Sequence, residues 1–216
     1  MKYKYILFDM DGTLIDSSPG ITRCVADTLK EFGIDKKPEE YLNFIGPPFI
    51  VSARNILHFE EEKAMQATKL YREYFSKEEY LYDIKLFDGV IDMLETLKQR
   101  GALLFIATCR PKPFAQAIVD HYNLNKYFEI VGGLPIDTIG GEKADVIHEI
   151  FKNYPTSRKE EYVMVGDRDQ DMIGAKKAGI DAIGLRMGFA APGELEAYSP
   201  VYIADNISAL KAFLLS

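Results

Sequence analysis

Residues 5–13 have the sequence YILFDMDGT, in which four apolar residues, 5–8, are followed at once by Asp9, with Asp11 two positions later. A short apolar run of this kind is typical of a strand buried in a parallel sheet, because helices cover both faces of such a strand. In open parallel sheets, ligands bind beyond the carboxyl ends of the strands. We therefore predict a strand at residues 5–8 and a functional site that contains Asp9 and Asp11.

Apolar runs recur in the rest of the chain at residues 103–107, 162–165 and 182–185. Amphipathic helices are predicted before some of these runs, and two of them end at a glycine, Gly101 or Gly179, in the position of a C-terminal cap. Strands that alternate with helices form right-handed βαβ units and a parallel sheet covered on both faces. The predicted fold class is therefore α/β, with a Rossmann-like three-layer core.

Residues 16–87 break this alternation and contain no convincing strand. Apolar residues at helical spacing predict helices at 21–32 and 60–75. Turn-forming residues flank the segment on both sides, which indicates an insertion. We predict a discontinuous α/β core domain, residues 1–15 and 88–216, with residues 16–87 as an inserted α-helical cap domain.

Polar residues follow the other predicted strands as well. Thr108 follows one strand, Asp167 and Asp171 follow another, and Lys143 stands at the start of a predicted helix, 144–151. In a parallel sheet these residues share one rim with the two aspartates of the first strand. Carboxylates so close together repel one another, and a hard cation removes the repulsion. Oxygen ligands without His or Cys suit Mg²⁺, which we predict as the cofactor.

This set of side chains supplies what phosphoryl transfer requires. The carboxylate of Asp9 is a competent nucleophile toward phosphorus and would form an aspartyl-phosphate. Asp11 points to the same side of an extended strand, so it can protonate the leaving oxygen and then accept a proton from the attacking water. A metal ion, a lysine and a hydroxyl would stabilise the phosphoryl oxygens.

The motifs resemble those of the haloacid dehalogenase superfamily of phosphatases, and the resemblance covers the whole chain. Residues 9–13 (DMDGT) match the first motif, and the later motifs match in order at Thr108, at Lys143, and at Asp167 with Asp171. The helical insert after the first motif, and two segments with the sequences GPP (46–48) and GFAAPGEL (188–195), resemble the phosphoglycolate phosphatase-like branch with a small cap.

The resemblance implies a role for each matching residue. The catalytic residues would be Asp9, Asp11, Thr108 and Lys143. The substrate phosphate would bind to Gly12, Thr13, Thr108, Cys109 and Lys143. The ligands of Mg²⁺ would be the side chains of Asp9 and Asp167 and the backbone carbonyl of Asp11, with Asp171 behind them or beside Lys143. Cys109-Arg110 departs from the family, in which a small polar residue and then Asn or Lys are more common.

Two other interpretations of these residues are not supported. A cysteine phosphatase with Cys109 as nucleophile would need an arginine several residues later, where residues 115–117 are Ala-Gln-Ala. The segment Gly140-Gly141-Glu142-Lys143 lacks the glycine spacing and the Ser or Thr of a nucleotide P-loop. We interpret Cys109 as a small residue at a strand end.

Composition limits the partners. The chain has 216 residues and a net charge of −7, which argues against a nucleic-acid partner because DNA requires a basic face. No apolar run is long enough to cross a membrane, and the two cysteines belong to no C-x-x-C pair. We expect a cytoplasmic protein, for which a monomer is plausible, that acts on a small phosphorylated metabolite.

The predicted function is Mg²⁺-dependent hydrolysis of a small phosphomonoester, similar to that of a phosphoglycolate phosphatase. A 5′-nucleotidase or a pyrophosphatase of the same branch is the alternative. A phosphosugar mutase is less favoured, because mutases of the superfamily usually have Val or Ala where this chain has Thr13. A non-catalytic phospho-ligand-binding protein would be expected to have lost an active-site carboxylate, and the sequence retains all of them.

Overall fold

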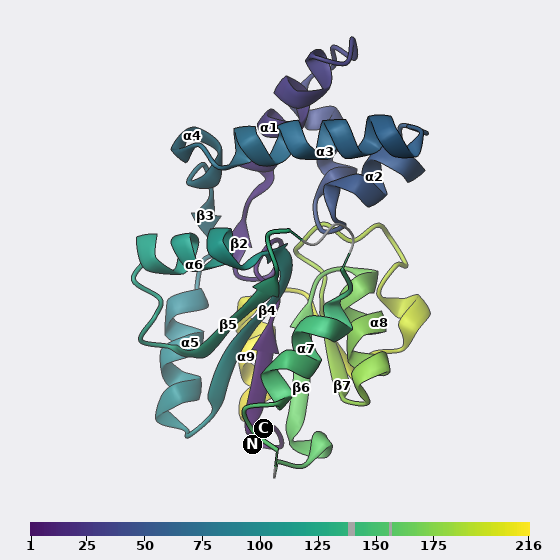
Figure 1. The fold of residues 1–216 in the computed structure, drawn as a ribbon. Helices are drawn as coiled ribbons and strands as arrows, with labels where there is room; N and C mark the ends of the chain where they lie inside the picture. The colour runs from purple at the N-terminus through teal and green to yellow at the C-terminus, as the bar shows by residue number, and fades with distance from the viewer. Residues whose placement is uncertain (138–140, 156) are drawn as a thin grey trace.

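The computed structural model describes residues 1–137, 141–155 and 157–216 (Figure 1). Its centre is a six-stranded sheet in the order β5-β4-β1-β6-β7-β8, in which all neighbouring strands are parallel. The strands are β1 (Tyr5–Phe8), β4 (Leu103–Pro111), β5 (Phe128–Leu134), β6 (Tyr162–Gly166), β7 (Asp181–Leu185) and β8 (Tyr202–Ala204). The predicted α/β class is confirmed, and β1 lies where residues 5–8 were predicted.

Helices cover both faces of the sheet, and the alternation of side chains along β1 shows why. Ile6 and Phe8 join one hydrophobic cluster, whereas Tyr5 and Leu7 join the other. The first cluster includes residues of α5 (Val90–Gln99), α6 (Lys112–His121) and α9 (Ile207–Leu215). The second includes residues of α7 (Lys143–Phe151) and α8 (Asp169–Ala178). A strand buried on both faces needs the unbroken apolar run seen in the sequence.

The helices between β1 and α5 lie together beyond the carboxyl ends of the strands (Figure 1). They are α1 (Ser18–Lys30), the 3-10 helix η1 (Pro38–Phe44), α2 (Phe49–Asn55), α3 (Glu61–Phe75) and α4 (Glu78–Leu81). Stacked rings join α2 and α3, because the ring centroids of Phe49 and Tyr71 lie 4.5 Å apart. The division into a core and a cap at residues 16–87 stays a prediction, to which this arrangement gives support.

The prediction that residues 16–87 contain no strand is wrong at both ends of that segment. A two-stranded antiparallel ribbon pairs β2 (Ile15–Asp16) with β3 (Lys85–Leu86). The chain thus leaves and re-enters the core through two adjacent strands. Two residues per strand are too few to show an alternating pattern, so the ribbon could not be predicted from the sequence.

Two strands of the main sheet, β5 and β8, also differ from the sequence-based expectation. β5 contains Gly132 and Gly133, and a Cβ atom on these residues would lie 2.9 Å and 2.7 Å from the carbonyl oxygens of Ile106 and Arg110. Glycine is therefore favoured by the close approach of β4, although it weakens the sequence pattern of a strand.

The remaining short helices are η2 (Lys159–Glu161) and η3 (Glu196–Tyr198). Among the described residues, no helix combines the length and the hydropathy that a membrane span requires.

Candidate active site

Lys143 lies at the centre of a buried charge cluster at the carboxyl end of the sheet. It is the first residue of α7, and its Nζ lies 2.7 Å from Oδ1 of Asp9 and 2.8 Å from Oδ1 of Asp171. The ammonium also donates a hydrogen bond to the carbonyl of Ala107 at 2.8 Å. Burial alone would lower the pKa of Lys143, but Asp171 and Asp9 outweigh it and the pKa is raised. Lys143 is therefore a permanent cation within the cluster.

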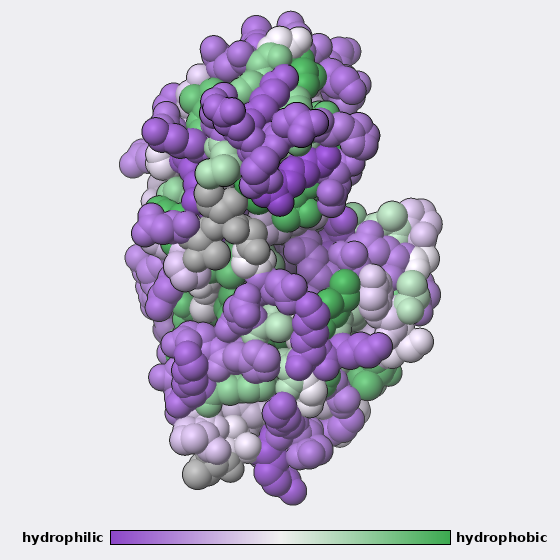
Figure 2. Space-filling model, turned by 45° about the vertical axis from the view of Figure 1, so that its right-hand side comes forward, coloured by the Kyte–Doolittle hydropathy of each residue, from purple (hydrophilic) through white to green (hydrophobic). Residues whose placement is uncertain are grey.

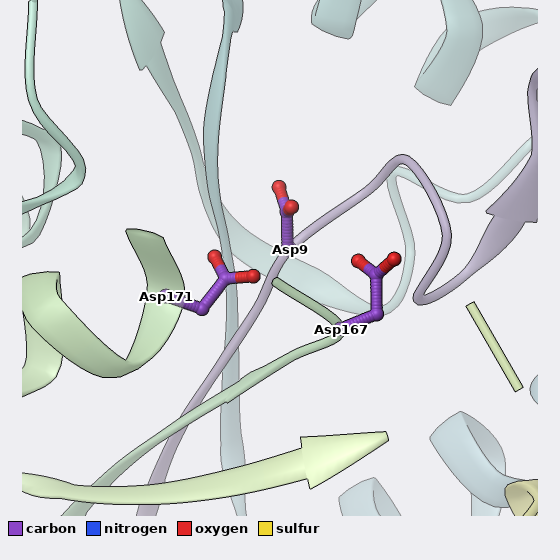
Figure 3. Close-up of side chains that lie close together, drawn as sticks. All are labelled: Asp9, Asp167 and Asp171. Atoms are coloured by element: carbon purple, nitrogen blue, oxygen red, sulfur yellow. The ribbon is translucent and has the colours of Figure 1, made fainter. Parts of the chain in front are cut away.

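Asp9, Asp167 and Asp171 form a buried group of three carboxylates with ligand oxygens within 4.8 Å of one another. Figure 3 shows that they come from the end of β1, the end of β6 and the start of α8. Burial raises the pKa of Asp9 to about 7, although Lys143 opposes the shift. Burial and the charges of Asp171 and Asp9 raise the pKa of Asp167 well above its ordinary value.

The cluster has three carboxylates and one lysine, which contacts two of them, so full ionisation of the acids would leave an excess of negative charge. Ionised carboxylates with raised pKa values are stabilised by a bound cation. The side chains of the cluster offer oxygen and no sulfur or imidazole ligand, which suits Mg²⁺ better than zinc or copper. The residues present therefore fit a hard divalent cation.

Glycines allow the backbone to approach these carboxylates closely. A Cβ atom on Gly12 would lie 2.1 Å from Oδ2 of Asp167, and one on Gly188 would lie 2.3 Å from Cβ of Asp167. A Cβ atom on Gly166 would lie 2.1 Å from Cγ of Asp171. Real Cβ atoms do not come so near to other atoms, so any larger residue would move the acids.

Asp167 is further held by two donors from other segments. The backbone N–H of Phe189 donates to Oδ2 at 2.7 Å, and the hydroxyl of Thr13 donates to Oδ1 at 3.3 Å. Asp171 accepts a hydrogen bond from the backbone N–H of Arg168 at 3.1 Å, which caps α8. The orientation of these carboxylates is thus fixed by the chain around them.

The side chain of Asp11 is directed to a different partner. Arg110 forms a two-point ion pair with it, in which Nε donates to Oδ2 at 3.1 Å and an NH2 group donates to Oδ1. The Cζ atom of Arg110 also lies 4.7 Å from the ring centroid of Phe75 in α3. Burial opposes ionisation of Asp11, but Arg110 outweighs it and holds the pKa of Asp11 below its ordinary value. Asp11 is therefore ionised in this arrangement.

Thr108 and Cys109 lie at the end of β4, beside the charge cluster. The hydroxyl of Thr108 is buried and accepts a hydrogen bond from the backbone N–H of Arg110 at 3.1 Å. Burial raises the pKa of the Cys109 thiol to about 12, more than Lys143 can offset. A thiol that stays protonated is a poor nucleophile, which agrees with the interpretation of Cys109 as a small residue at a strand end.

A cavity of about 90 Å³ lies between α3 and the rim, next to Asp11 and Arg110. Its walls are mainly apolar and aromatic, and they include Phe49, Tyr71 and Phe75. A second, open cleft separates residues 47–55 from Lys143 and the start of α8. Figure 2 shows a hollow between the upper and lower parts of the molecule with largely hydrophilic walls.

Arginines join the helical segment to the core across these hollows. Arg168 donates to the carbonyl of Ile45 and pairs with Glu194 at 2.8 Å. Arg72 of α3 donates to the carbonyl of Ile136 at 2.6 Å. The helical segment thus contacts loops on two sides of the rim in this structure.

The structure brings together four residues predicted for the site, Asp9, Asp167, Asp171 and Lys143. Asp11 lies at the same rim, but its side chain pairs with Arg110 and is not one of the three carboxylates that could hold a metal ion together. Gly140 falls outside the described residues. Sequence reasoning missed the ion pair of Arg110 with Asp11 and the contacts of Arg168; the unusual Cys109-Arg110 pair was the one available signal for the former.

Comparison with known proteins identifies the class that this fold and this site define. Residues 6–185 match the family described as haloacid dehalogenase-like hydrolases, and the chain belongs to that family. The match confirms the resemblance inferred from the motifs and the prediction of an enzyme of the phosphatase class.

Two relatives and one solved structure show how similar the chain is to individual proteins. The chain is 36% identical over 217 residues to a 5′-nucleotidase of Pseudomonas aeruginosa, covering 100% of this chain and 97% of the relative. It is 29% identical over 216 residues to phosphoglycolate phosphatase 1 of the same organism, covering 94% of this chain and 77% of the relative. The crystal structure of a predicted phosphatase from Clostridium acetobutylicum is similar with a TM-score of 0.94 and 34% identity, covering 100% and 99% of the two chains.

Proposed function

We propose that this protein catalyses Mg²⁺-dependent hydrolysis of a small phosphomonoester through an aspartyl-phosphate on Asp9. The observation that carries the proposal is the buried group of Asp9, Asp167 and Asp171 with Lys143 in contact with two of its members. Phosphoryl transfer requires a nucleophilic carboxylate, a permanent cation and acidic side chains that can hold a metal ion, all at one rim.

The side chains of Asp9 and Asp167, with the backbone carbonyl of Asp11, are the proposed ligands of Mg²⁺. Asp171 is proposed to support the site through its contact with Lys143. When bound, the cation would neutralise charge on the phosphoryl oxygens and keep the carboxylates ionised at neutral pH. The group of three acids found here would also allow Asp171 to contact the ion.

The proposed reaction has two steps at Asp9. In the first, a carboxylate oxygen of Asp9 attacks phosphorus, the bond to the alcohol oxygen breaks, and Asp11 gives that oxygen a proton. In the second, Asp11 removes a proton from water, the resulting hydroxide attacks phosphorus, and the carboxylate of Asp9 leaves. Lys143, Thr108 and the backbone around Gly12, Thr13 and Cys109 are proposed to hold the phosphoryl oxygens.

The ion pair with Arg110 bears on the role of Asp11. An ionised Asp11 is ready to accept a proton from water, which is the second half of its task. To donate a proton in the first step, Asp11 must take one up, and the contact with Arg110 opposes this. We therefore infer that Arg110 moves relative to Asp11 when substrate binds.

The helical segment is proposed to act as a cap that excludes bulk water from the rim. Its residues line the cavity beside Asp11, where the alcohol part of the substrate must lie. The chain is similar to relatives named 5′-nucleotidase and phosphoglycolate phosphatase. We therefore propose nucleoside 5′-monophosphates and phosphoglycolate as the first substrates to test. The cytoplasmic location and the monomeric state remain predictions.

The test is a phosphate-release assay over a panel of phosphometabolites, with Mg²⁺ or with excess chelator. We expect release that stops in chelator, returns with Mg²⁺ and is lost in Asp9→Asn, an isostere that cannot attack phosphorus. Release equal to the substrate consumed separates hydrolysis from the mutase alternative. Near-native turnover of Asp9→Asn would remove Asp9 from the nucleophilic role.

A further inference from the structure

Glu194 is a largely buried carboxylate whose two oxygens both accept hydrogen bonds. Oε1 accepts hydrogen bonds from Nε of Arg168 at 2.8 Å and from the backbone N–H of Asp169 at 2.9 Å. Oε2 accepts a hydrogen bond from the backbone N–H of Ala191, also at 2.9 Å. Burial opposes ionisation of Glu194, but these donors outweigh it and hold its pKa below the ordinary value. Glu194 therefore joins the chain after β6 to the chain after β7.

The same two segments hold Asp167. Asp167 directly precedes Arg168 in the sequence, and its Oδ2 accepts a hydrogen bond from the backbone N–H of Phe189 at 2.7 Å. Phe189 lies two residues before Ala191, whose N–H donates to Glu194. Glu194 thus ties the loop that carries the donor of Asp167 to the residues that follow Asp167. Loss of this carboxylate would free the loop, and with it the N–H that orients Asp167.

The side chain of Arg168 extends this network to the helical segment. One of its NH groups donates a hydrogen bond to the carbonyl of Ile45, 123 residues away in the sequence, while Nε pairs with Glu194. The side chain of Arg168 is 14% exposed. Gly46 permits the close approach, since it has a φ of +105° and a Cβ atom there would lie 3.1 Å from Cγ of Arg168. A larger residue at this position would strain the backbone and press the loop and the arginine apart.

We propose that Arg168 and Glu194 couple the position of the loop at residues 45–48 to the orientation of Asp167, and so to the affinity of the site for Mg²⁺. This inference rests on the proposed function, in which Asp167 is a ligand of the ion. Both are positioning residues, because they act on the ion through Asp167. Coupling between two sites is reciprocal, so an ion that fixes Asp167 also fixes the loop. The helical segment then lies most firmly on the rim when Mg²⁺ is bound.

Calorimetric titration with Mg²⁺ measures the first half of this coupling. Glu194→Gln keeps the shape of the side chain and places an amide NH₂ group against N–H donors, whereas Arg168→Gln removes the guanidinium. We expect each variant to bind Mg²⁺ roughly tenfold more weakly, as for other residues that orient metal ligands. Because the two residues act through each other, the double variant should lose little more than either single variant.

Arg186→Gln is the matched control for these variants. Arg186 pairs with Glu196 at 2.7 Å, at the two ends of the same loop, and about half of each side chain is exposed. Its loss should leave the affinity for Mg²⁺ unchanged. Equal affinity in the wild type, Glu194→Gln and Arg168→Gln would overturn the inference.

Hydrogen exchange of the backbone amides of residues 46 and 49–51 measures the second half. In the wild type, saturating Mg²⁺ should slow this exchange by roughly fivefold or more, the lower end of typical coupling between sites. In Glu194→Gln and Arg168→Gln most of this slowing should be lost, even at Mg²⁺ concentrations that saturate the variants. A general loss of stability would speed the exchange with and without the ion alike. Weaker binding of Mg²⁺ together with wild-type slowing would refute the coupling.

Gly46→Ala covers the case in which the core variants fail to fold, because it changes the helical segment alone. We expect it to weaken Mg²⁺ binding by roughly fivefold while far-ultraviolet circular dichroism stays unchanged. Gly33→Ala is its control, since Gly33 also has a positive φ, +76°, and an added Cβ atom there would meet none of the described atoms within 4 Å. Equal affinities for Mg²⁺ in the two alanine variants would refute the inference.

The wild type separates this inference from the proposed function. If it binds Mg²⁺ and releases phosphate, and all the variants bind Mg²⁺ equally well, the inference fails and the proposed function stands. If it binds Mg²⁺ but releases no phosphate from any ester of the panel, the proposed function fails and the binding ratios alone decide the inference. A wild type that does not bind Mg²⁺ would refute both.

Discussion

Removal of divalent cations should make the stability of this protein fall as the pH rises from 5.0 to 7.5. The reason lies in the carboxylate group, where burial raises the pKa of Asp9 from an ordinary 3.8 to about 7 and also raises that of Asp167. Within this pH range the folded state binds more protons than the unfolded state, so the free energy of unfolding decreases with pH. Most proteins with paired carboxylates show the opposite slope on the acid side of neutrality.

The magnitude follows from the two pKa values of Asp9. In the unfolded chain Asp9 is almost fully ionised above pH 5, whereas in the folded chain it ionises only near pH 7. Between pH 5.0 and 7.5 the difference is about 2.5 kcal/mol for Asp9 alone, at 1.36 kcal/mol per pH unit. For a chain of this length the melting temperature would fall by roughly 5–10 °C. The pKa values of Asp11 and Glu194 are lowered in the folded state, so these two groups change the free energy of unfolding below pH 5 and do not offset the effect of Asp9.

Urea unfolding at a series of pH values in excess chelator measures this slope. Asp9→Asn is the matched control, because it keeps the shape of the side chain and removes its titration, and its slope should be distinctly smaller. Saturating Mg²⁺ should stabilise the wild type more at pH 7.5 than at pH 5.0, since it binds ionised carboxylates. A wild-type stability that is flat or rises over this range in chelator, with the same profile in Asp9→Asn, would refute the reasoning.

Three further substitutions test separate parts of the site. Lys143→Met leaves Asp9 and Asp171 without their common cation and should cost about 3–5 kcal/mol in urea unfolding in the absence of Mg²⁺, less in its presence. Gly188→Ala forces Asp167 aside and should weaken Mg²⁺ binding in calorimetry by roughly 10–100-fold, with the melting temperature in chelator as its control. Thr108→Val removes the hydroxyl that is proposed to bind phosphate and should lower kcat of phosphate release by roughly a hundredfold, while far-ultraviolet circular dichroism stays unchanged.

Local sequence patterns predicted the elements that are long or strongly apolar. The helix expected at 60–75 corresponds to α3, which runs from Glu61 to Phe75, and the strand expected at 5–8 matches β1. The ribbon of β2 and β3 and the glycine-containing strand β5 were missed. Their conformation is set by contacts with distant segments, and such contacts leave little trace in local periodicity.

The site shows the same division between local and distant information. Placement at strand ends was enough to bring Asp9, Asp167 and Asp171 to one rim, because parallel strands end at the same edge. The direction in which a side chain points at that rim was not predictable in this way. Asp11 turns to Arg110, 99 residues away in sequence, and only the fold reveals that pairing.

Arg110 connects the rim to the helical segment, and this has a consequence for how substrate specificity can change. The three carboxylates and Lys143 lie at strand ends and helix starts of the core. The glycines beside the carboxylates leave no room for a larger side chain at their own positions. Arg110, in contrast, contacts Asp11 on one side and the ring of Phe75 on the other. A substitution in α3 can therefore shift the guanidinium, and with it the ion pair of the proposed acid, without contact with any of the proposed metal ligands. We infer that substitutions in the helical segment alter the preferred alcohol and the rate together, whereas those at the carboxylate group affect all substrates alike.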